Sequence, residues 1–200
     1  MTIDHDPRLY LIVPPRIAAD TLAAALDGGD VACVLLCEPG GGAKDCVRVA
    51  QNREVAVLVP DDPQCVQELD ADGLHLGTGG DAKAVRKRLG PERILGVACG
   101  NSRHDGMLAG EAGADYVAFS GRDDRPGHAA DTATLGWWQA MMTVPCVATG
   151  RIALGDVGDL ARAGADFVAL DEAVWEHPDG PAEAVAEANR RLDAAKAGRV

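Results

Sequence analysis

Short apolar runs alternate with longer amphipathic segments along the whole chain. Eight of these runs are almost continuous in apolar side chains, which is expected for strands that are buried on both faces of a parallel sheet. The predicted strands are Leu9–Val13, Val31–Cys37, Val55–Val59, Gly73–Leu76, Ile94–Val97, Tyr116–Phe119, Cys146–Ala148 and Phe167–Leu170.

The segments between the runs are rich in Ala, Leu, Glu and Arg, and several begin near an Asp or Pro, as helices do. The predicted helices are Ala18–Leu26, Lys44–Gln51, Pro63–Leu69, Ala82–Leu89, Asp105–Ala112, Leu135–Met142, Gly155–Ala163 and Ala182–Ala195. Eight such alternations within 200 residues predict an α/β fold, a compact (β/α)8 TIM barrel that forms a single domain over residues 1–200.

A near-repeat in the chain supports the barrel. AGADYVAF at residues 112–119 and AGADFVAL at 163–170 are close copies, and LDADGLHL at 69–76 is a looser one. Each predicts the end of a helix, a tight turn at the Asp and a short strand. The Asp residues of these words are 43 and 51 residues apart, the length of two βα units. The alternative, a doubly wound sheet, would be favoured by a G-x-G-x-x-G turn after the first strand, and the chain has none there.

The charge balance restricts the partners and the location. With 31 acidic and 19 basic residues the net charge is −12, and no basic cluster offsets it, so we expect no nucleic acid and no membrane as partners. No apolar run approaches the roughly 18 residues of a membrane span. The six cysteines form no C-x-x-C pair, which predicts buried thiols in a reduced compartment and a cytoplasmic location. One exposed ring of the Trp137-Trp138 pair would suit a homodimer contact.

Several words of the chain follow the order and spacing of one family of barrels. Asp72–Gly77 reads DGLHLG, Val144–Ile152 reads VPCVATGRI and Ala163–Ala169 reads AGADFVA. Two further words are YLIV, which begins at Tyr10, and ILGV at Ile94–Val97. Together these words resemble the thiamine phosphate synthase/TenI family over nearly the whole chain. The resemblance implies synthases that join a pyrimidine diphosphate to a thiazole phosphate and release pyrophosphate with Mg²⁺ bound. TenI-type members instead aromatise a thiazole tautomer.

The family motif that holds the pyrimidine diphosphate is changed in this chain. The family carries Gln-x-Arg-x-Lys on its second strand, and alignment on Glu38 places Leu35, Cys37 and Pro39 at these positions. The three ligating groups are therefore replaced. On the fifth strand, Ala98 and Cys99 stand where the family has a Ser word.

Two carboxylates are candidate Mg²⁺ ligands by the same resemblance. Asp61 retains the Asp of the family's Asn-Asp word after the third strand, whereas Asp81 is displaced by one position from the Asp after the fourth. Asp81 is also placed to cap the next helix. His75 lies in an apolar word, so we expect it to pack or to bond to backbone rather than to bind a metal.

The loop Ser120–Thr134 is polar and interrupted by Gly and Pro. It follows the sixth predicted strand, on the face where barrel active sites form, and is either a lid or a surface loop without function. The family's Thr-x-Thr-Lys word, which contacts pyrophosphate, is absent, and the TenI-type His aligns with Gly121. Arg122, Arg125 and His128 are candidates to replace the missing positive charge.

The phosphate cup of the family is changed as well. Gly150 retains the first residue of its Gly-Gly word, but Arg151 replaces the second, and Asp171 and Glu172 stand where a Ser word belongs. Two carboxylates repel a phosphate. We therefore expect Arg151 to pair with Asp171 or Glu172 and to close the pocket with an internal ion pair.

These replacements favour a diverged paralogue that binds a small molecule of unknown identity and has altered or lost activity. The first alternative is an active synthase with a rebuilt site that uses Asp61, Asp81 and loop arginines. The second is a different small-molecule enzyme with carboxylates as acid/base groups. Candidate catalytic residues are Asp61, Glu38 and Glu172.

Overall fold

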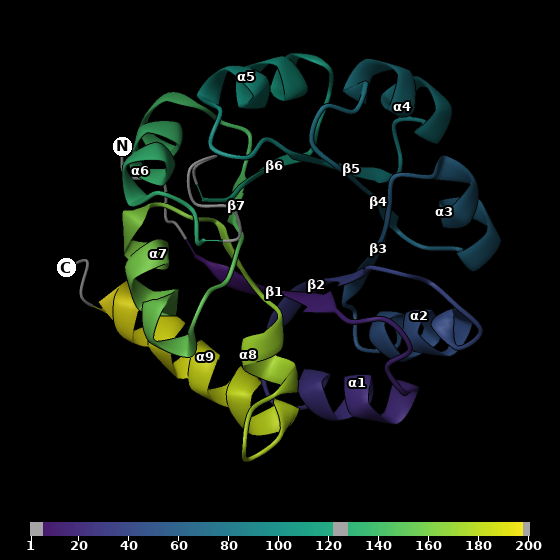
Figure 1. Cartoon of the computed structure of the whole chain (residues 1–200), viewed down its shortest axis with the longest axis vertical. Coiled ribbons are helices and arrows are strands. Elements are labelled where there is room, and N and C mark those ends of the chain that lie inside the picture. Colours follow the sequence, from purple (N-terminus) through teal and green to yellow (C-terminus); the bar gives the residue numbers. More distant parts are fainter. Residues whose placement is uncertain (1–5, 122–127, 198–200) are drawn as a thin grey trace.

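A closed barrel of parallel strands forms the centre of the molecule (Figure 1). The computed structural model describes residues 6–121 and 128–197. Within these ranges eight strands pair in the order of the sequence, and the last strand returns to pair with the first. They are β1 (Arg8–Val13), β2 (Val31–Leu36), β3 (Ala56–Pro60), β4 (Gly73–Leu76), β5 (Ile94–Ala98), β6 (Tyr116–Phe119), β7 (Cys146–Ala148) and β8 (Phe167–Leu170). The predicted (β/α)8 barrel is confirmed.

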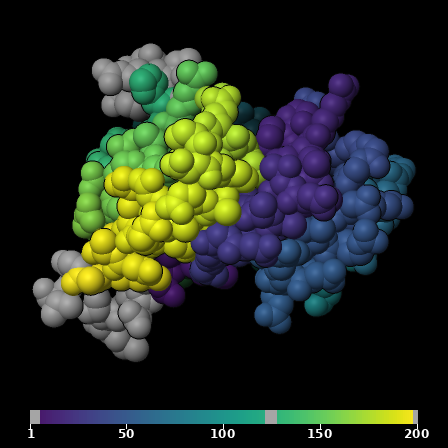
Figure 2. Space-filling view, turned by 90° about the horizontal axis from the view of Figure 1, so that it is seen from below, coloured from purple at the N-terminus to yellow at the C-terminus, as the bar shows by residue number. Residues whose placement is uncertain are grey.

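Helices surround the barrel on the outside (Figure 1). The described ranges contain α1 (Ala19–Leu26), α2 (Ala43–Gln51), α3 (Pro63–Leu69), α4 (Ala82–Leu89), α5 (Arg103–Glu111), α6 (Thr132–Met141), the 3₁₀ turn η1 (Leu154–Asp156), α7 (Val157–Ala163), α8 (Glu172–Trp175) and α9 (Pro181–Ala197). The α9 helix packs against α1 and α7 and so completes the ring of helices (Figure 2). None of the helices in the described part of the chain has the length and apolar character needed to cross a membrane.

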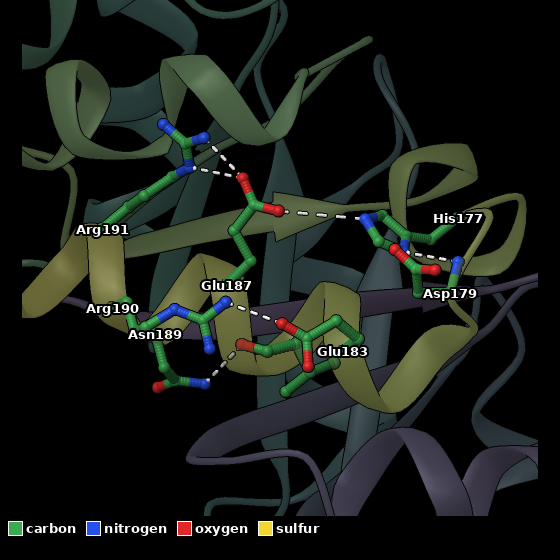
Figure 3. Close-up of polar contacts among 8 residues, drawn as sticks. His177, Asp179, Glu183, Glu187, Asn189, Arg190 and Arg191 are labelled. Carbon is green, nitrogen blue, oxygen red and sulfur yellow. Dashed lines mark hydrogen bonds and ion pairs between the residues drawn. The ribbon is translucent and has the colours of Figure 1, made fainter.

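The short helix α8 was not predicted from the sequence. Four residues are too few to show a helical period. The helix is held by burial of Val174 and by the indole N–H of Trp175, which donates to the carbonyl of Ile12 on β1 at 2.7 Å. Charged side chains line the longer helix α9, where Glu187 accepts from Arg191 and Glu183 accepts from Arg190 (Figure 3).

Apolar side chains form two separate layers because successive strand residues point to opposite faces. The larger layer lies between the strands and the helices and includes Phe119 and Trp138. The smaller layer fills the barrel interior with Tyr10, Cys33, Leu35, Leu58, Tyr116, Ala118, Val147 and Ala169.

The Asp of each repeated word ties two neighbouring strands together. It lies directly before an even-numbered strand and accepts a hydrogen bond from a backbone N–H of the preceding strand, while its own N–H donates to the carbonyl of that same residue. The three clips join Asp72 to Val57 (Oδ2···N 2.8 Å), Asp115 to Leu95 (2.8 Å) and Asp166 to Cys146 (2.7 Å). The repeat in the sequence is thus a repeated backbone contact.

A fourth Asp occupies the equivalent place before β2. Asp30 precedes Val31 and receives two hydrogen bonds from the guanidinium of Arg8 on β1, both at 2.7 Å. A side chain of β1 here replaces the backbone donor of the other three clips. Asp30 follows Gly-Gly rather than Ala-Gly-Ala, which is why the repeat did not reveal it.

Removal of one clip should weaken the barrel measurably. We expect Asp72→Ala to lower the free energy of unfolding by about 1–3 kcal/mol, because the Val57 N–H loses its acceptor. Asp72→Asn retains an acceptor oxygen and should lose less. Urea denaturation of both variants measures the difference. Equal stability of wild type and Asp72→Ala would show that the clip contributes nothing.

Candidate functional site

The polar residues singled out from the sequence gather at one end of the barrel. Parallel strands all end at the same edge, and barrel active sites form there. Glu38 follows β2, Asp61 follows β3, Arg151 follows β7 and Asp171 follows β8. Arg122 and Arg125 lie outside the described residues.

Asp61 bridges the ends of β3 and β4. Its backbone has a φ of 53°, in the left-handed region, and its N–H donates to the carbonyl of His75 at 3.2 Å. One carboxylate oxygen accepts from the Gly77 N–H at 2.7 Å. A side chain on Gly77 would approach this carboxylate, since an added Cβ would lie 3.3 Å from the same oxygen. Asp61 therefore has one oxygen committed to the fold.

Asp81 begins α4, as one of its two interpretations predicted. Its carboxylate accepts from the Ala84 N–H at 2.9 Å and so caps the helix. In residues 6–121 and 128–197 no three His, Cys, Asp or Glu side chains are grouped to hold a metal ion. Mg²⁺ is often held by one or two carboxylates together with substrate phosphates. The described carboxylates fit only this way of holding Mg²⁺, in which Asp61 would be the protein ligand and phosphate oxygens of a bound molecule would supply the rest.

The end of β2 has a negative environment. Leu35 is buried in the barrel interior, and Cys37 is partly buried beyond it. Burial raises the pKa of the Cys37 thiol, and the charges of Glu38 and Asp171 raise it further. The negative charge of Asp171 thus acts on Cys37, the position where the resemblance implies a positively charged Arg.

The segment that begins at His128 lies against Gly150 and Arg151, the positions of the family's phosphate cup. His128 forms an isolated parallel bridge with Arg151, and its carbonyl accepts from the Gly121 N–H at 2.7 Å. Gly150 has a φ of 110°, and an added Cβ there would lie only 2.1 Å from the His128 oxygen. Only glycine fits beneath this loop. His128 and Arg151 are therefore brought together, as far as their backbones are concerned.

The ion pair expected for Arg151 stays a prediction. The Arg151 side chain is exposed, and no ion pair with Asp171 or Glu172 is seen among the described residues. Asp171 precedes the first turn of α8 and makes no side-chain hydrogen bond to it, and Glu172 is the first residue of that helix. A carboxylate in the first turn interacts favourably with the helix dipole.

His75 has a different partner from the one we expected. Its Nδ1 lies 2.7 Å from the hydroxyl of Tyr116, and that hydroxyl lies 3.2 Å from the hydroxyl of Tyr10. Burial lowers the pKa of His75 to about 4, against a smaller opposing effect of Asp61. The ring is therefore neutral at pH 7. The contact among the three residues was missed in the sequence because they lie on strands far apart in the chain; their inward-facing strand positions were the available signal.

Known proteins resemble this chain over most of its length. The family model described as Thiamine monophosphate synthase matches residues 9–174. A thiamine-phosphate synthase of Rhodospirillum centenum is 44% identical over 201 residues, which cover 92% of this chain and 97% of the relative. A thiamine-phosphate synthase of Hyphomonas neptunium is 41% identical over 199 residues, covering 89% and 90%.

Solved structures share the fold at lower sequence identity. Thiamine phosphate pyrophosphorylase from Pyrococcus furiosus superposes with a TM-score of 0.83 at 20% identity, covering 96% of this chain and 98% of that one. The 3-hexulose-6-phosphate synthase from Salmonella typhimurium has a TM-score of 0.72 at 17% identity, covering 94% and 99%. At this level of identity the solved structures show only that the barrel fold is shared. The family model and the two close relatives, in contrast, are similar to this chain in amino-acid sequence. The chain therefore belongs to the thiamine monophosphate synthase family.

Proposed function

We propose that this chain is a diverged family member that binds a small molecule at the C-terminal face and has altered or lost the coupling activity. The observation that carries the proposal is the environment of Cys37. The resemblance implies a guanidinium there to hold a diphosphate, but this chain has a thiol whose pKa is raised by burial, Glu38 and Asp171.

The magnitude of this exchange favours a loss of diphosphate binding. Two unit charges about 5 Å apart interact by about 3 kcal/mol at an effective dielectric constant of about 20. The replacement of a guanidinium by the Cys37 thiol removes one such term, and the nearby carboxylate of Asp171 adds an opposing one. Loss of that stabilisation also raises the barrier, because the transition state gathers charge on the leaving oxygens.

Two features support retention of a ligand site at this face. Asp61 holds its carboxylate at the strand ends, and Arg151 is an exposed cation beside Gly150. Mg²⁺ enters the proposal only through Asp61 and only together with a phosphate-bearing ligand. An active synthase with a rebuilt site is the second candidate, and the names of the close relatives favour it.

The partners and the location remain proposals. A net charge of −12 favours a small molecule over nucleic acid or a membrane surface, and the cytoplasm remains the predicted location. A homodimer also remains a prediction. Its suggested contact, Trp137, is covered on one side by Arg103, whose guanidinium lies 4.8 Å from the ring centroid.

A direct assay tests the proposal. We expect the full chain, incubated with the pyrimidine diphosphate, the thiazole phosphate and Mg²⁺, to release pyrophosphate at least about 10³-fold more slowly than the Pyrococcus furiosus protein under its own optimal conditions, which corresponds to about 4 kcal/mol of barrier. Turnover within tenfold of that control would overturn the proposal and support an active synthase with a rebuilt site.

A gain of binding is expected when the missing cation is restored. Cys37→Arg should tighten the binding of inorganic pyrophosphate with Mg²⁺ by tenfold or more, since about 1.4 kcal/mol suffices for that factor. Calorimetric titration measures the dissociation constants. Cys37→Met is the matched control, because it adds length without charge, and it should bind like wild type. Equal tightening by both variants would refute the electrostatic explanation.

A further inference from the structure

A cavity of about 280 Å³ opens at the end of the barrel where the strands begin. Its wall contains the first residues of three strands, Ile94 of β5, Tyr116 of β6 and Phe167 of β8. Ile94 and Phe167 are partly exposed. Asp61 and Arg151 follow strand ends instead, so this cavity is separate from the candidate functional site.

The cavity exists because the side chains at the strand starts do not fill the barrel. Barrel interiors are normally packed by layers of inward-facing side chains. Arg8 of β1 instead directs its guanidinium to Asp30, with two hydrogen bonds of 2.7 Å. Ala56, the first residue of β3, contributes only a methyl group to the wall. The outermost layer therefore leaves an apolar space.

Two tyrosines form the inner wall of the cavity. Tyr10 and Tyr116 line it and are only 3% and 7% exposed. They belong to the Tyr–Tyr–His chain, in which the Tyr116 hydroxyl contacts both the Tyr10 hydroxyl and His75. In the part of the chain that the structure describes, the Tyr10 hydroxyl has no other hydrogen-bond partner. A hydroxyl has one donor and two acceptor positions, so Tyr10 retains capacity for a hydrogen bond to a bound molecule.

The charged groups of the described wall are already paired. Arg8 is held by Asp30, and Asp115 forms an ion pair with Arg86. An ionic ligand would therefore find no free opposite charge in this wall, and burial of an unpaired charge is costly. The cavity favours a neutral molecule for this reason.

The chain reaches β1 along the outside of the barrel. Asp6 forms an ion pair with Lys196 on α9, and α9 packs against α1 and α7 in the outer ring of helices. The described chain thus begins beside this ring. That position favours an external molecule over the start of the chain itself as the occupant of the cavity.

We propose that this cavity binds a neutral molecule with a single aromatic ring and one hydroxyl or N–H group. Ile94 and Phe167 contact the ring, and Tyr10 forms a hydrogen bond with the polar group. Apolar cavities of about 150 Å³ take up benzene, so about 280 Å³ accommodates a substituted ring. The site does not depend on the proposed function, because it lies at the opposite end of the barrel.

Calorimetric titration of the full chain with p-cresol at pH 7 tests the site. We expect a dissociation constant of about 0.1–1 mM, which is the range for a ligand of this size. The anion 4-methylbenzoate carries a similar ring and should bind about tenfold more weakly or less, since its charge has no partner. Absence of p-cresol binding up to about 10 mM, or equal binding of the anion, would overturn the proposal.

A variant that fills the cavity locates the bound molecule. Ala56→Leu should weaken p-cresol binding by about tenfold or more, because the larger side chain takes up the space of the ring. Ala24→Leu is the matched control, since it adds the same atoms at an exposed position of α1, and it should bind like wild type. Equal weakening in both variants would contradict binding in the cavity.

NMR of the wild-type chain locates the ligand even if Ala56→Leu does not fold. Nuclear Overhauser effects should connect the ring protons of p-cresol to the methyl groups of Ile94. Such effects with strand-end residues alone would overturn the proposal.

The hydrogen bond has its own test. Tyr10→Phe should weaken p-cresol binding by about threefold or more and leave toluene binding unchanged, because toluene lacks the hydroxyl. An equal effect on both ligands, or none on p-cresol, would contradict the role of Tyr10.

Two other occupants of the cavity are distinguishable in the same titrations. Binding of p-cresol that appears only after deletion of residues 2–5 would make the start of the chain the occupant. Binding that weakens as the protein concentration rises would make a second copy of the chain the occupant. Either result would overturn the proposal.

Discussion

The paired contact between an Asp and the preceding strand is the constraint from which the rest of this barrel follows. Each clip uses both backbone groups of one strand residue, at Val57, Leu95 and Cys146. It sets the register of neighbouring strands at the end of the barrel opposite the site. Since a shift of one residue turns every side chain to the other face, this register decides which residues face inward. The Tyr–Tyr–His chain and the negative end of β2 depend on that choice.

The two ends of the barrel carry different kinds of residues. The clips at one end repeat across the fold and belong to its stability. At the other end, Leu35, Cys37 and the start of α8 occupy places where the family resemblance implies polar or small phosphate-binding groups. Barrel folds separate stability from chemistry in this way, so the phosphate site can change without loss of the scaffold. The contacts of His75 with Tyr116 and of Tyr116 with Tyr10 lie between the two ends.

Much of the fold could be read from the sequence, and less of the site. The strands Gly73–Leu76 and Tyr116–Phe119 were predicted to the residue, because buried parallel strands are short apolar runs with Gly or Asp at their ends. The helix α8 after Asp171 was missed because its four residues have no period to detect. The contact between His75 and Tyr116 joins residues 41 positions apart, and no local pattern reports such a distance.

The return of β8 to β1 has a consequence for how the chain is made. That pairing joins segments about 160 residues apart, and closure of a loop of this length costs about 4–5 kcal/mol of chain entropy. Until β8 has been made, one side of β1 therefore has no strand to pair with. Such an edge can pair with another chain. Pairing of β8 with β1 covers this edge, and α9 then packs against α1 on the outside of the barrel.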